Sequence, residues 1–416
     1  MQRVAACADV SIGGALQAIA GRITHSSMLR APARRAFAAD VGSEKWEISA
    51  SFGKSTVTQE LWRRREQQSV GIGGSHAVLY KFSKVSSLRD EYVGNTGKVL
   101  VGRMLEDLDA LAGNVANDWC QEIQSSDGSP LMLVTAAVDK IRLARPVKIT
   151  EDVVLSGRAI WTGNSSMLVR MYMQSETHRG ERLLEADFVY VARDRATLKS
   201  VKVPQVEPAN EEEEELFRDG EKKAAAKRGM RKRLSARASE VQTTLEAMVA
   251  EGHIMSDLPS VRIKQGTMGK VLMNVTAREC LLLTKPQERN TAGRVFGGFL
   301  MRECYNLAFA TCFAFSGLHP VFIEVTDFVF GKAVQVGSLL QLKSRVIHTS
   351  GSRVFVEVLL KVIRPVEGES FDANKIVVVY DCGAAMPEVV PATKGEALAK
   401  LHALEVLGEC DRESSA

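Results

Sequence analysis

The chain has 416 residues, 45% of them hydrophobic and 25% charged, and a formal net charge of +4. At roughly 150 residues per domain this length allows two or three domains, and the composition excludes collagen-like, disordered and disulfide-scaffold proteins. The longest apolar run, 307–315, is too short to span a membrane, the seven cysteines form no CxxC pair, and the charge gives no sign of nucleic-acid binding. We therefore expect a soluble protein of a reducing compartment, with no metal site and no cofactor.

The first residues differ in composition from the rest of the chain. From Met1 to Ala39 there are five arginines, no lysine and a single acid, Asp9, whereas acids follow at once from Asp40. A basic, acid-poor and alanine-rich start is typical of a mitochondrial presequence. We expect residues 1–40 to be a targeting peptide that directs the chain to the mitochondrial matrix, with a plastid address as the alternative.

Residues 41–200 are expected to form a first folded domain. A segment with several glycines, 94–105, leads into a run whose apolar residues recur at helical spacing. Runs rich in β-branched residues follow and predict strands, with a turn cluster at 162–166 between the second and the third. These strand runs are 131–141, 153–161, 167–173 and 186–191.

A strongly charged stretch opens at Glu211–Glu215 and ends the first domain. Its acids and bases nearly cancel, and aromatic residues are not interleaved with the basic ones, so the stretch does not resemble a nucleic-acid surface. We expect residues 201–258 to be a charged linker or helical segment.

The remainder of the chain repeats the first half. With Gly97 placed on Gly293, an offset of 196 residues, Gly102 meets Gly298. A second helical run and a second set of strands follow, and we expect residues 259–390 to form a second domain before a tail, 391–416. The strand runs of this half are 321–329, 339–347, 354–362 and 376–380, with a turn cluster at 349–353.

The glycines that open the second helix have a possible chemical use. The chain contains neither GxxxxGK[ST] nor a GxGxxG that opens a βαβ unit, which argues against a nucleotide-phosphate loop. Without side chains, Gly297 and Gly298 leave backbone N–H groups open at a helix N-terminus, where they could stabilise the oxyanion of a thioester. The alternative is that both glycines only permit a tight loop and close packing.

Three segments, taken in order, resemble one known family. They are STVTQELW at 55–62, VGRMLEDLD at 101–109 and the run NTAGRVFGGFLMR at 290–302. This set resembles hotdog-fold acyl-CoA thioesterases, and the two copies resemble the double-hotdog members of the mitochondrial branch, the acyl-CoA thioesterase 9 group. The resemblance implies an α+β tandem hotdog fold, each unit a long helix wrapped by an antiparallel sheet. It also implies hydrolysis of fatty acyl-CoA to fatty acid and CoA by an activated water.

The resemblance further implies that an Asn at the loop start and an Asp on the helix act together from opposite halves. The Asn position is Asn290 in the second half and Gly94 in the first, and the Asp position is Asp109 in the first half and Tyr305 in the second. We therefore expect one active site, built from Asp109 and Asn290, and one degenerate site, which lacks catalytic groups unless the neighbouring Asn95 or Asn306 substitutes.

Helical periodicity independently singles out Asp109. At 100° per residue Asp109 lies about 20° from the apolar Ala116, which makes a carboxylate there costly without partners. Glu106 falls on the polar side, and Asp107 borders the other edge of the apolar face, where Asp107→Asn is expected to be nearly silent. The alternative for Asp109 is a surface carboxylate at a subunit border.

Substrate contacts are predicted from the resemblance as well, since it implies that CoA runs along the interface of the two halves. Ser165, Ser166, Ser352 and Arg353 lie in the turn clusters, and Arg302 lies just inside the second helix. We expect these five residues to meet the CoA phosphates; the alternative is that they are solvated surface residues.

Two other functions stay open at this point. A non-catalytic acyl-CoA or nucleotide sensor on the same fold would tolerate the loss of Asp109. A hotdog dehydratase would need a histidine facing a carboxylate, whereas the seven histidines avoid both glycine loops. The expected partners are acyl-CoA and further copies of the chain, most simply as a trimer.

Overall fold

The structure is a computed structural model that describes residues 40–41, 44–45, 54–66, 75–139, 141–178, 180–234, 269–290, 292–326 and 328–414. All of them belong to one unit, Phe37–Ala416. The targeting peptide predicted over 1–40 lies outside the described residues, apart from Asp40. None of the helices in the described ranges is long and apolar enough to cross a membrane.

The first half contains the predicted helix and strands, preceded by elements that the patterns did not predict. Its long helix, α4, follows the glycine-containing segment, and a hairpin turn at 163–165 joins β6 to β7. The elements are β1 (Asp40–Val41), β2 (Glu44–Lys45), α2 (Thr56–Glu66), β3 (Ser75–Tyr80), α3 (Ser86–Tyr92), α4 (Val101–Trp119), β4 (Met132–Val138), β5 (Ile141–Leu143), β6 (Val153–Thr162), β7 (Ser166–Ser175) and β8 (Glu181–Arg193).

The second half repeats this order around its own long helix, α7. A two-residue turn joins β13 to β14, as the second turn cluster predicts. The elements are β9 (Lys270–Leu272), β10 (Arg278–Leu283), α7 (Gly297–Ser316), β11 (Val321–Val325), β12 (Phe328–Val329), β13 (Leu339–Ser350), β14 (Arg353–Arg364), β15 (Glu369–Asp381) and β16 (Glu388–Val390).

The sheets of the two halves join edge to edge. The strand order is β10-β13-β14-β15-β11-β5-β8-β7-β6-β3, and the junction is the antiparallel pair β11–β5, where Val325 lies opposite Ile141. Strands β12 and β4 pair across the same boundary. The two halves therefore share one continuous sheet.

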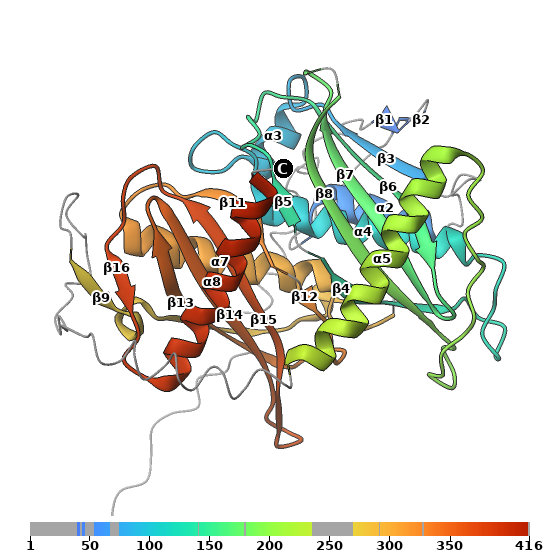
Figure 1. Ribbon diagram of the computed structural model, residues 1–416. Helices are drawn as coiled ribbons and strands as arrows, with labels where there is room; N and C mark the ends of the chain where they lie inside the picture. The colour runs from blue at the N-terminus through green and yellow to red at the C-terminus, as the bar shows by residue number, and fades with distance from the viewer. Residues whose placement is uncertain are drawn as a thin grey trace, which may run out of the picture. The chain divides into compact units, whose positions relative to one another are not determined.

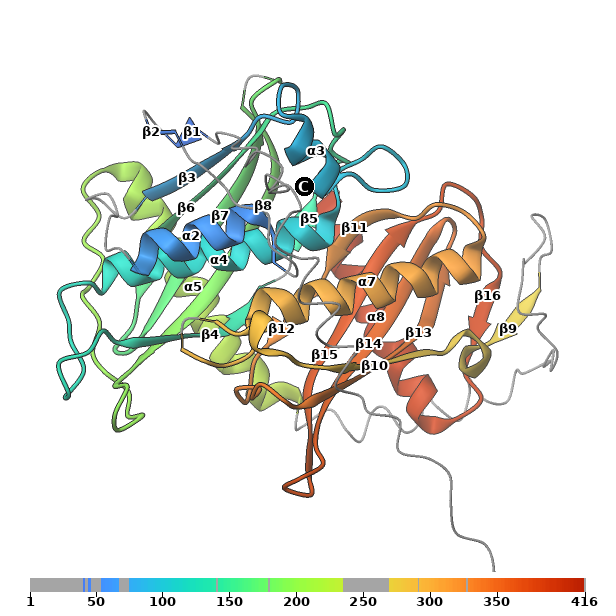
Figure 2. The same cartoon turned by 180° about the vertical axis from the view of Figure 1, so that it is seen from behind.

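The long helices α4 and α7 lie on one face of this sheet, with α2 beside α4 (Figure 2). Leu105, Leu108 and Ala112 of α4 are fully buried, as are Met301 and Ala308 of α7. An apolar helix against the inner face of an antiparallel sheet buries the alternating apolar residues of the strands. The fold is thus α+β with two hotdog units in tandem.

Two further helices, α5 (Glu211–Leu234) and α8 (Lys394–Ser414), cover the opposite face (Figure 1). Of the charged linker expected over 201–258 the structure describes 201–234, and α5 is the helical part of it. It approaches β6 so closely that a Cβ at Gly220 would lie 2.6 Å from Trp161 Cβ. Asp219 and Arg170 form a 2.6 Å ion pair between this helix and the sheet. The expected tail, 391–416, forms α8, in which Ala397, Ala399 and Ala403 are buried.

Candidate active site

The two long helices cross in contact near their N-terminal ends, because each has a glycine at the crossing. A Cβ at Gly298 would lie 2.9 Å from Glu106 Cα, and a Cβ at Gly102 would lie 3.2 Å from both Tyr305 and Asn306. Gly298 and Gly102 are the pair that the internal repeat aligns, so the helices are related by an approximate twofold axis. This crossing brings the start of each helix against the middle of the other.

Asp109 lies at one of these two places and is only 2% exposed. Its Oδ1 accepts hydrogen bonds from Thr135 Oγ1 at 3.0 Å and from the Tyr190 hydroxyl at 3.1 Å. Its Oδ2 accepts the backbone N–H of Gly298 at 2.7 Å. Since Gly298 is in the first turn of α7, the carboxylate caps that helix from the other half and interacts favourably with the helix dipole. Three donors thus offset the cost of burying this carboxylate.

The first residue of α7 must be glycine for this contact to form. A Cβ at Gly297 would lie 2.9 Å from Asp109 Oδ2, closer than a side chain tolerates. The Gly297 N–H is in the first helical turn, where no intrahelical acceptor exists for it, and Gly297 lines the cavity beside Asp109. The N–H groups of the two glycines therefore differ, since that of Gly298 is bound to Asp109.

A cavity of about 440 Å³, here called the Asp109 cavity, opens beside this carboxylate and is lined by both halves. Asn290 lines it too, so the structure brings together the two residues that the family resemblance pairs. Asn290 Oδ1 accepts the N–H groups of Ala292 at 2.9 Å and of Arg294 at 3.0 Å. These bonds hold the glycine loop through Oδ1 and do not use the Nδ2 donor.

The wall of the Asp109 cavity is largely apolar and its mouth is basic. Trp62 of α2 lines it and packs edge-on against Phe296, with ring centroids 4.9 Å apart. The cationic residues that line it are Arg193, Arg294 and Lys332, all exposed. No histidine is found among the described residues that line this cavity. The described residues also contain no group of three or more His, Cys, Asp and Glu able to hold a metal ion.

Two expectations about neighbouring acids are wrong. Asp107 is fully buried rather than at a solvent edge, and it accepts hydrogen bonds from four hydroxyls. The donors are Ser55, Thr58 (2.7 Å), Tyr80 (2.9 Å) and Tyr92 (2.5 Å). Burial raises the pKa of Asp107 to about 6, against the opposing effect of these donors. The reason is that α2 and the segment 80–92 cover a helix face that the periodicity of α4 alone leaves open.

Glu106 was expected on the polar side of α4, yet it is also fully buried. It forms a 2.6 Å ion pair with Arg302 on α7, and the two residues occupy equivalent positions of the repeat. The pair therefore lies at the twofold axis, where the helices are closest. Burial raises the pKa of Glu106 to about 7, although Arg302 opposes this shift.

None of the five residues predicted to meet the CoA phosphates lines the Asp109 cavity. Ser165 and Ser166 lie at the β6–β7 turn, and Ser352 and Arg353 lie at the β13–β14 turn. The Arg302 side chain is 12% exposed and bound to Glu106. Their role in binding CoA stays a prediction.

Sequence reasoning missed three residues of the Asp109 cavity. Thr135 and Tyr190 are opposite each other on β4 and β8, and both donate to Asp109. Only the register of two strands 55 residues apart places them together, although each lies in or beside a strand run that the sequence shows. Trp62 did have a signal, because it ends the 55–62 segment that carries part of the family resemblance.

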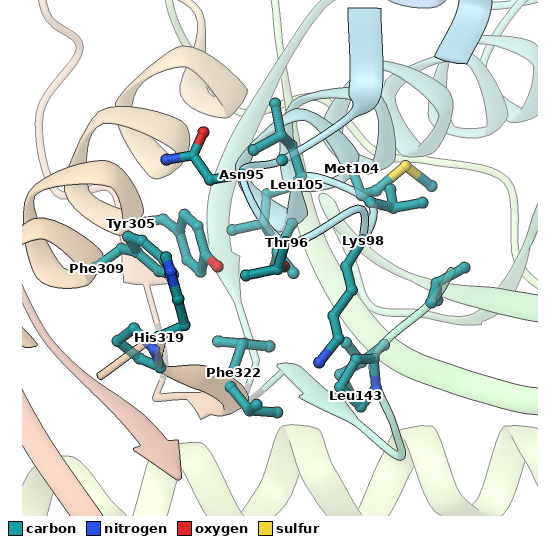
Figure 3. Close-up of a pocket in the computed structure, with 18 of the residues that line it drawn as sticks. Asn95, Thr96, Lys98, Met104, Leu105, Leu143, Tyr305, Phe309, His319 and Phe322 are labelled. Atoms are coloured by element: carbon teal, nitrogen blue, oxygen red, sulfur yellow. The ribbon is translucent and has the colours of Figure 1, made fainter. Parts of the chain in front are cut away.

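The twofold axis relates the Asp109 cavity to a second one, of about 270 Å³, here called the Lys98 cavity (Figure 3). Tyr305 takes the place of Asp109, and Gly94 takes that of Asn290. Phe322 lies opposite Tyr380 just before a β-bulge, as Thr135 lies opposite Tyr190 just before a β-bulge in the other half. The polar cluster of one site is an aromatic cluster in the other, with Tyr305 and Phe322 ring centroids 5.6 Å apart.

No family model matches the chain. The 12:0-ACP thioesterase from Umbellularia californica aligns with a TM-score of 0.44 at 10% identity, over 77% of this chain and 98% of that one. An acyl-CoA hydrolase from Staphylococcus aureus, in complex with butyryl coenzyme A, aligns with a TM-score of 0.33 at 18% identity, over 35% of this chain and 92% of that one.

The sequence relatives are more similar. Acyl-coenzyme A thioesterase 2, chloroplastic, of Humulus lupulus is 35% identical over 342 residues, 77% of each chain. Acyl-coenzyme A thioesterase 4, mitochondrial, of the same plant is 35% identical over 84% of this chain and 73% of its own length. Acyl-coenzyme A thioesterase 9, mitochondrial, of Homo sapiens is 35% identical over 77% of this chain and 74% of its own length. The chain belongs to the acyl-coenzyme A thioesterase family.

Proposed function

We propose that the Asp109 cavity is where this chain hydrolyses the thioester of fatty acyl-CoA. The observation that carries the proposal is a buried carboxylate, bound by three donors, beside an open helix N-terminus and Asn290. A fixed base next to oxyanion donors is what acyl transfer to water requires.

Asp109 acts as the general base in this proposal. A water held between Asp109 and Asn290 Nδ2 gives its proton to the carboxylate while its oxygen attacks the thioester carbon. The carbonyl oxygen becomes an oxyanion. When the tetrahedral intermediate collapses, the C–S bond breaks and the CoA sulfur takes the proton from Asp109, which leaves the fatty acid and free CoA.

The oxyanion is stabilised at the start of α7. Because the Gly298 N–H is bound to Asp109, the Gly297 N–H is the donor left for the substrate, and the positive end of the helix dipole adds to it. The hydrogen bond between the Gly298 N–H and Asp109 fixes the carboxylate relative to the Gly297 N–H. One contact therefore positions both the general base and the oxyanion site.

The cationic residues at the mouth of the Asp109 cavity support a polyanionic substrate. Arg193, Arg294 and Lys332 are all exposed there, and CoA carries several phosphates. The apolar wall suits the acyl chain. Ser165, Ser166, Ser352, Arg353 and Arg302 remain predicted contacts for more distant parts of CoA.

A panel of acyl-CoA substrates with detection of the released thiol tests the activity. Titration with a tight, non-hydrolysable acyl-CoA analogue should show one productive site per chain, because only one cavity contains the carboxylate. Thiol release from none of the acyl-CoAs, or two equal catalytic sites, would contradict the proposal.

We also propose a mitochondrial matrix location. Two of the relatives described above are named mitochondrial and one chloroplastic, and the composition of residues 1–40 favours the first address. N-terminal sequencing of the protein from isolated matrix should find about 40 residues removed. An intact Met1 in the cytosolic fraction would contradict this.

A trimer of chains is proposed as the assembly. Strand β10 is at one edge of the sheet, and its Leu281 and Leu283 are 57% and 56% exposed. Apolar side chains on an open edge favour pairing with another copy. Light scattering at micromolar concentration should give three times the chain mass; a stable monomer would contradict it.

A further inference from the structure

The Lys98 cavity has lost the catalytic groups but has not been filled. The aromatic side chains that replace the polar cluster leave a pocket of about 270 Å³ that is partly open to solvent. Its wall is mostly apolar and includes two flexible methionines. The apolar residues that line it include Met104, Leu105, Leu143, Met173, Leu184 and Phe309.

The charge of the Lys98 cavity is positive but smaller than that of the Asp109 cavity. Lys98 is its one cationic lining residue in the described chain, and no Asp or Glu lines it. Lys98 lies directly opposite Lys148 in an antiparallel bridge, an arrangement of like charges that destabilises the pair unless an anion is near. In the strands, Thr135 matches Phe322 at an offset of 187 residues, and at this offset the position equivalent to Lys332 is Arg145. The Arg145 guanidinium is bound to Glu151 at 2.7 Å and to Glu181 at 2.6 Å.

Besides Lys98, the polar side chains that line the cavity are Asn95, Thr96, Tyr305, Asn306 and His319. Figure 3 shows Lys98 and Tyr305 reaching into the cavity from the two halves, with the Tyr305 hydroxyl pointing into the space. Burial raises the pKa of Tyr305, so this hydroxyl stays a donor at neutral pH. An ammonium and a phenol can bind a carboxylate. Neither of these two groups can act as a general base in the way proposed for Asp109.

We propose that the Lys98 cavity binds a free fatty acid, with the chain among the apolar side chains and the carboxylate at Lys98, without chemical change. One cation with a neighbouring lysine suits a ligand with one negative charge. The three cations of the Asp109 cavity suit the several phosphates of CoA. Fatty-acid binding at the Lys98 cavity is a further function, and it does not depend on hydrolysis at the Asp109 cavity.

Dodecanoate binding to the full chain tests this site, with the Asp109 cavity blocked by a saturating non-hydrolysable acyl-CoA analogue. Calorimetry should show one dodecanoate per chain, and no binding of dodecylamine, whose charge is opposite. Lys98→Met should weaken dodecanoate binding about tenfold or more, because a hydrogen bond to a charged group is lost, and Lys98→Arg should restore it. Arg294→Met, at the equivalent position of the other cavity, is the matched control and should leave the dodecanoate affinity unchanged.

Asp109→Asn separates this site from the proposed hydrolysis. It should abolish most thiol release yet leave dodecanoate binding intact, so either idea can fail without the other. Absence of dodecanoate binding to the blocked chain, or equal affinity in wild type and Lys98→Met, would overturn the assignment. So would a second mole of the acyl-CoA analogue that displaces dodecanoate.

Discussion

The Asp109 cavity and the Lys98 cavity lie at equivalent places of the internal repeat, but they differ at the base and at two of the residues beside it. Asp109 is matched by Tyr305, Asn290 by Gly94 and Thr135 by Phe322. A buried carboxylate is costly unless each oxygen finds donors. The half that keeps the acid also keeps Thr135, whereas the other half has phenylalanine at that position and retains only the tyrosine, Tyr380 in place of Tyr190.

The difference shows what a tandem chain can do that a symmetric dimer cannot. In a homodimer the two sites have identical residues, so a change in one is a change in both. Here each half is encoded separately, and the Glu106–Arg302 pair at the axis shows the same freedom, with opposite charges at equivalent positions. One cavity can therefore remain catalytic while the other becomes a binding site.

The largest effect is expected for Asp109→Asn. The amide keeps one oxygen that can accept from Thr135 and Tyr190, but its NH2 cannot accept the Gly298 N–H, and the side chain cannot take the proton. We expect kcat to fall roughly 10²–10⁴-fold while KM changes much less. Asp118→Asn, on the opposite side of the same helix and outside both cavities, is the matched control and should keep full kcat. Wild-type rates in Asp109→Asn, with an unchanged melting curve, would mean that the two cavities do not differ as proposed.

Asn290→Asp should have the next largest effect. The carboxylate retains the oxygen that accepts from Ala292 and Arg294, so the loop is kept, but the Nδ2 donor is lost. We expect kcat to fall roughly 10- to 100-fold through a misplaced water, with little change in melting temperature. Steady-state kinetics beside a thermal melt checks this. A variant that loses stability rather than rate would show that Asn290 serves the loop alone.

A smaller loss is expected when a partner of the base is removed. Thr135→Val deletes the hydroxyl that donates to Asp109 Oδ1, and a hydrogen bond to a charged group corresponds to roughly a tenfold change in kcat. Thr135→Ser returns the hydroxyl and should recover most of the rate. If Thr135→Ser is as slow as Thr135→Val, packing of the methyl group rather than the hydroxyl determines the rate.

The smallest expected effect is on stability and depends on pH. Asp107→Asn disturbs a buried group with four donors and should cost about 1–3 kcal/mol of the free energy of unfolding. Because burial raises the pKa of Asp107 from 3.8 to about 6, the folded chain holds the proton more tightly between these values. Its stabilising contribution is complete below pH 4 and is lost as the pH rises through 6.

The melting-temperature difference between wild type and Asp107→Asn should therefore be larger at pH 5 than at pH 8. High salt should change this difference little, since buried groups are weakly screened. A difference that grows from pH 5 to pH 8 would contradict the direction of the pKa shift.

The sequence by itself determined the elements that set up the site. The 3.6-residue period predicted α4 and α7, and runs rich in β-branched residues predicted the strands that follow them. The 196-residue offset showed that only the first half has the Asp and only the second half has the Asn. Their pairing across the halves came from the family resemblance.

Tertiary structure decided which side chains surround those residues. From the periodicity of α4 alone, Glu106 was expected on the polar side of the helix and Asp107 at the edge of its apolar face. In the structure α7 and α2 cover those faces. The sequence of one helix does not specify which elements pack against it. Thr135 meets Asp109 only through the register of β4 against β8. The Lys98 cavity likewise exists because the two helices cross at Gly102 and Gly298, a long-range contact between parts of the chain that no local pattern specifies.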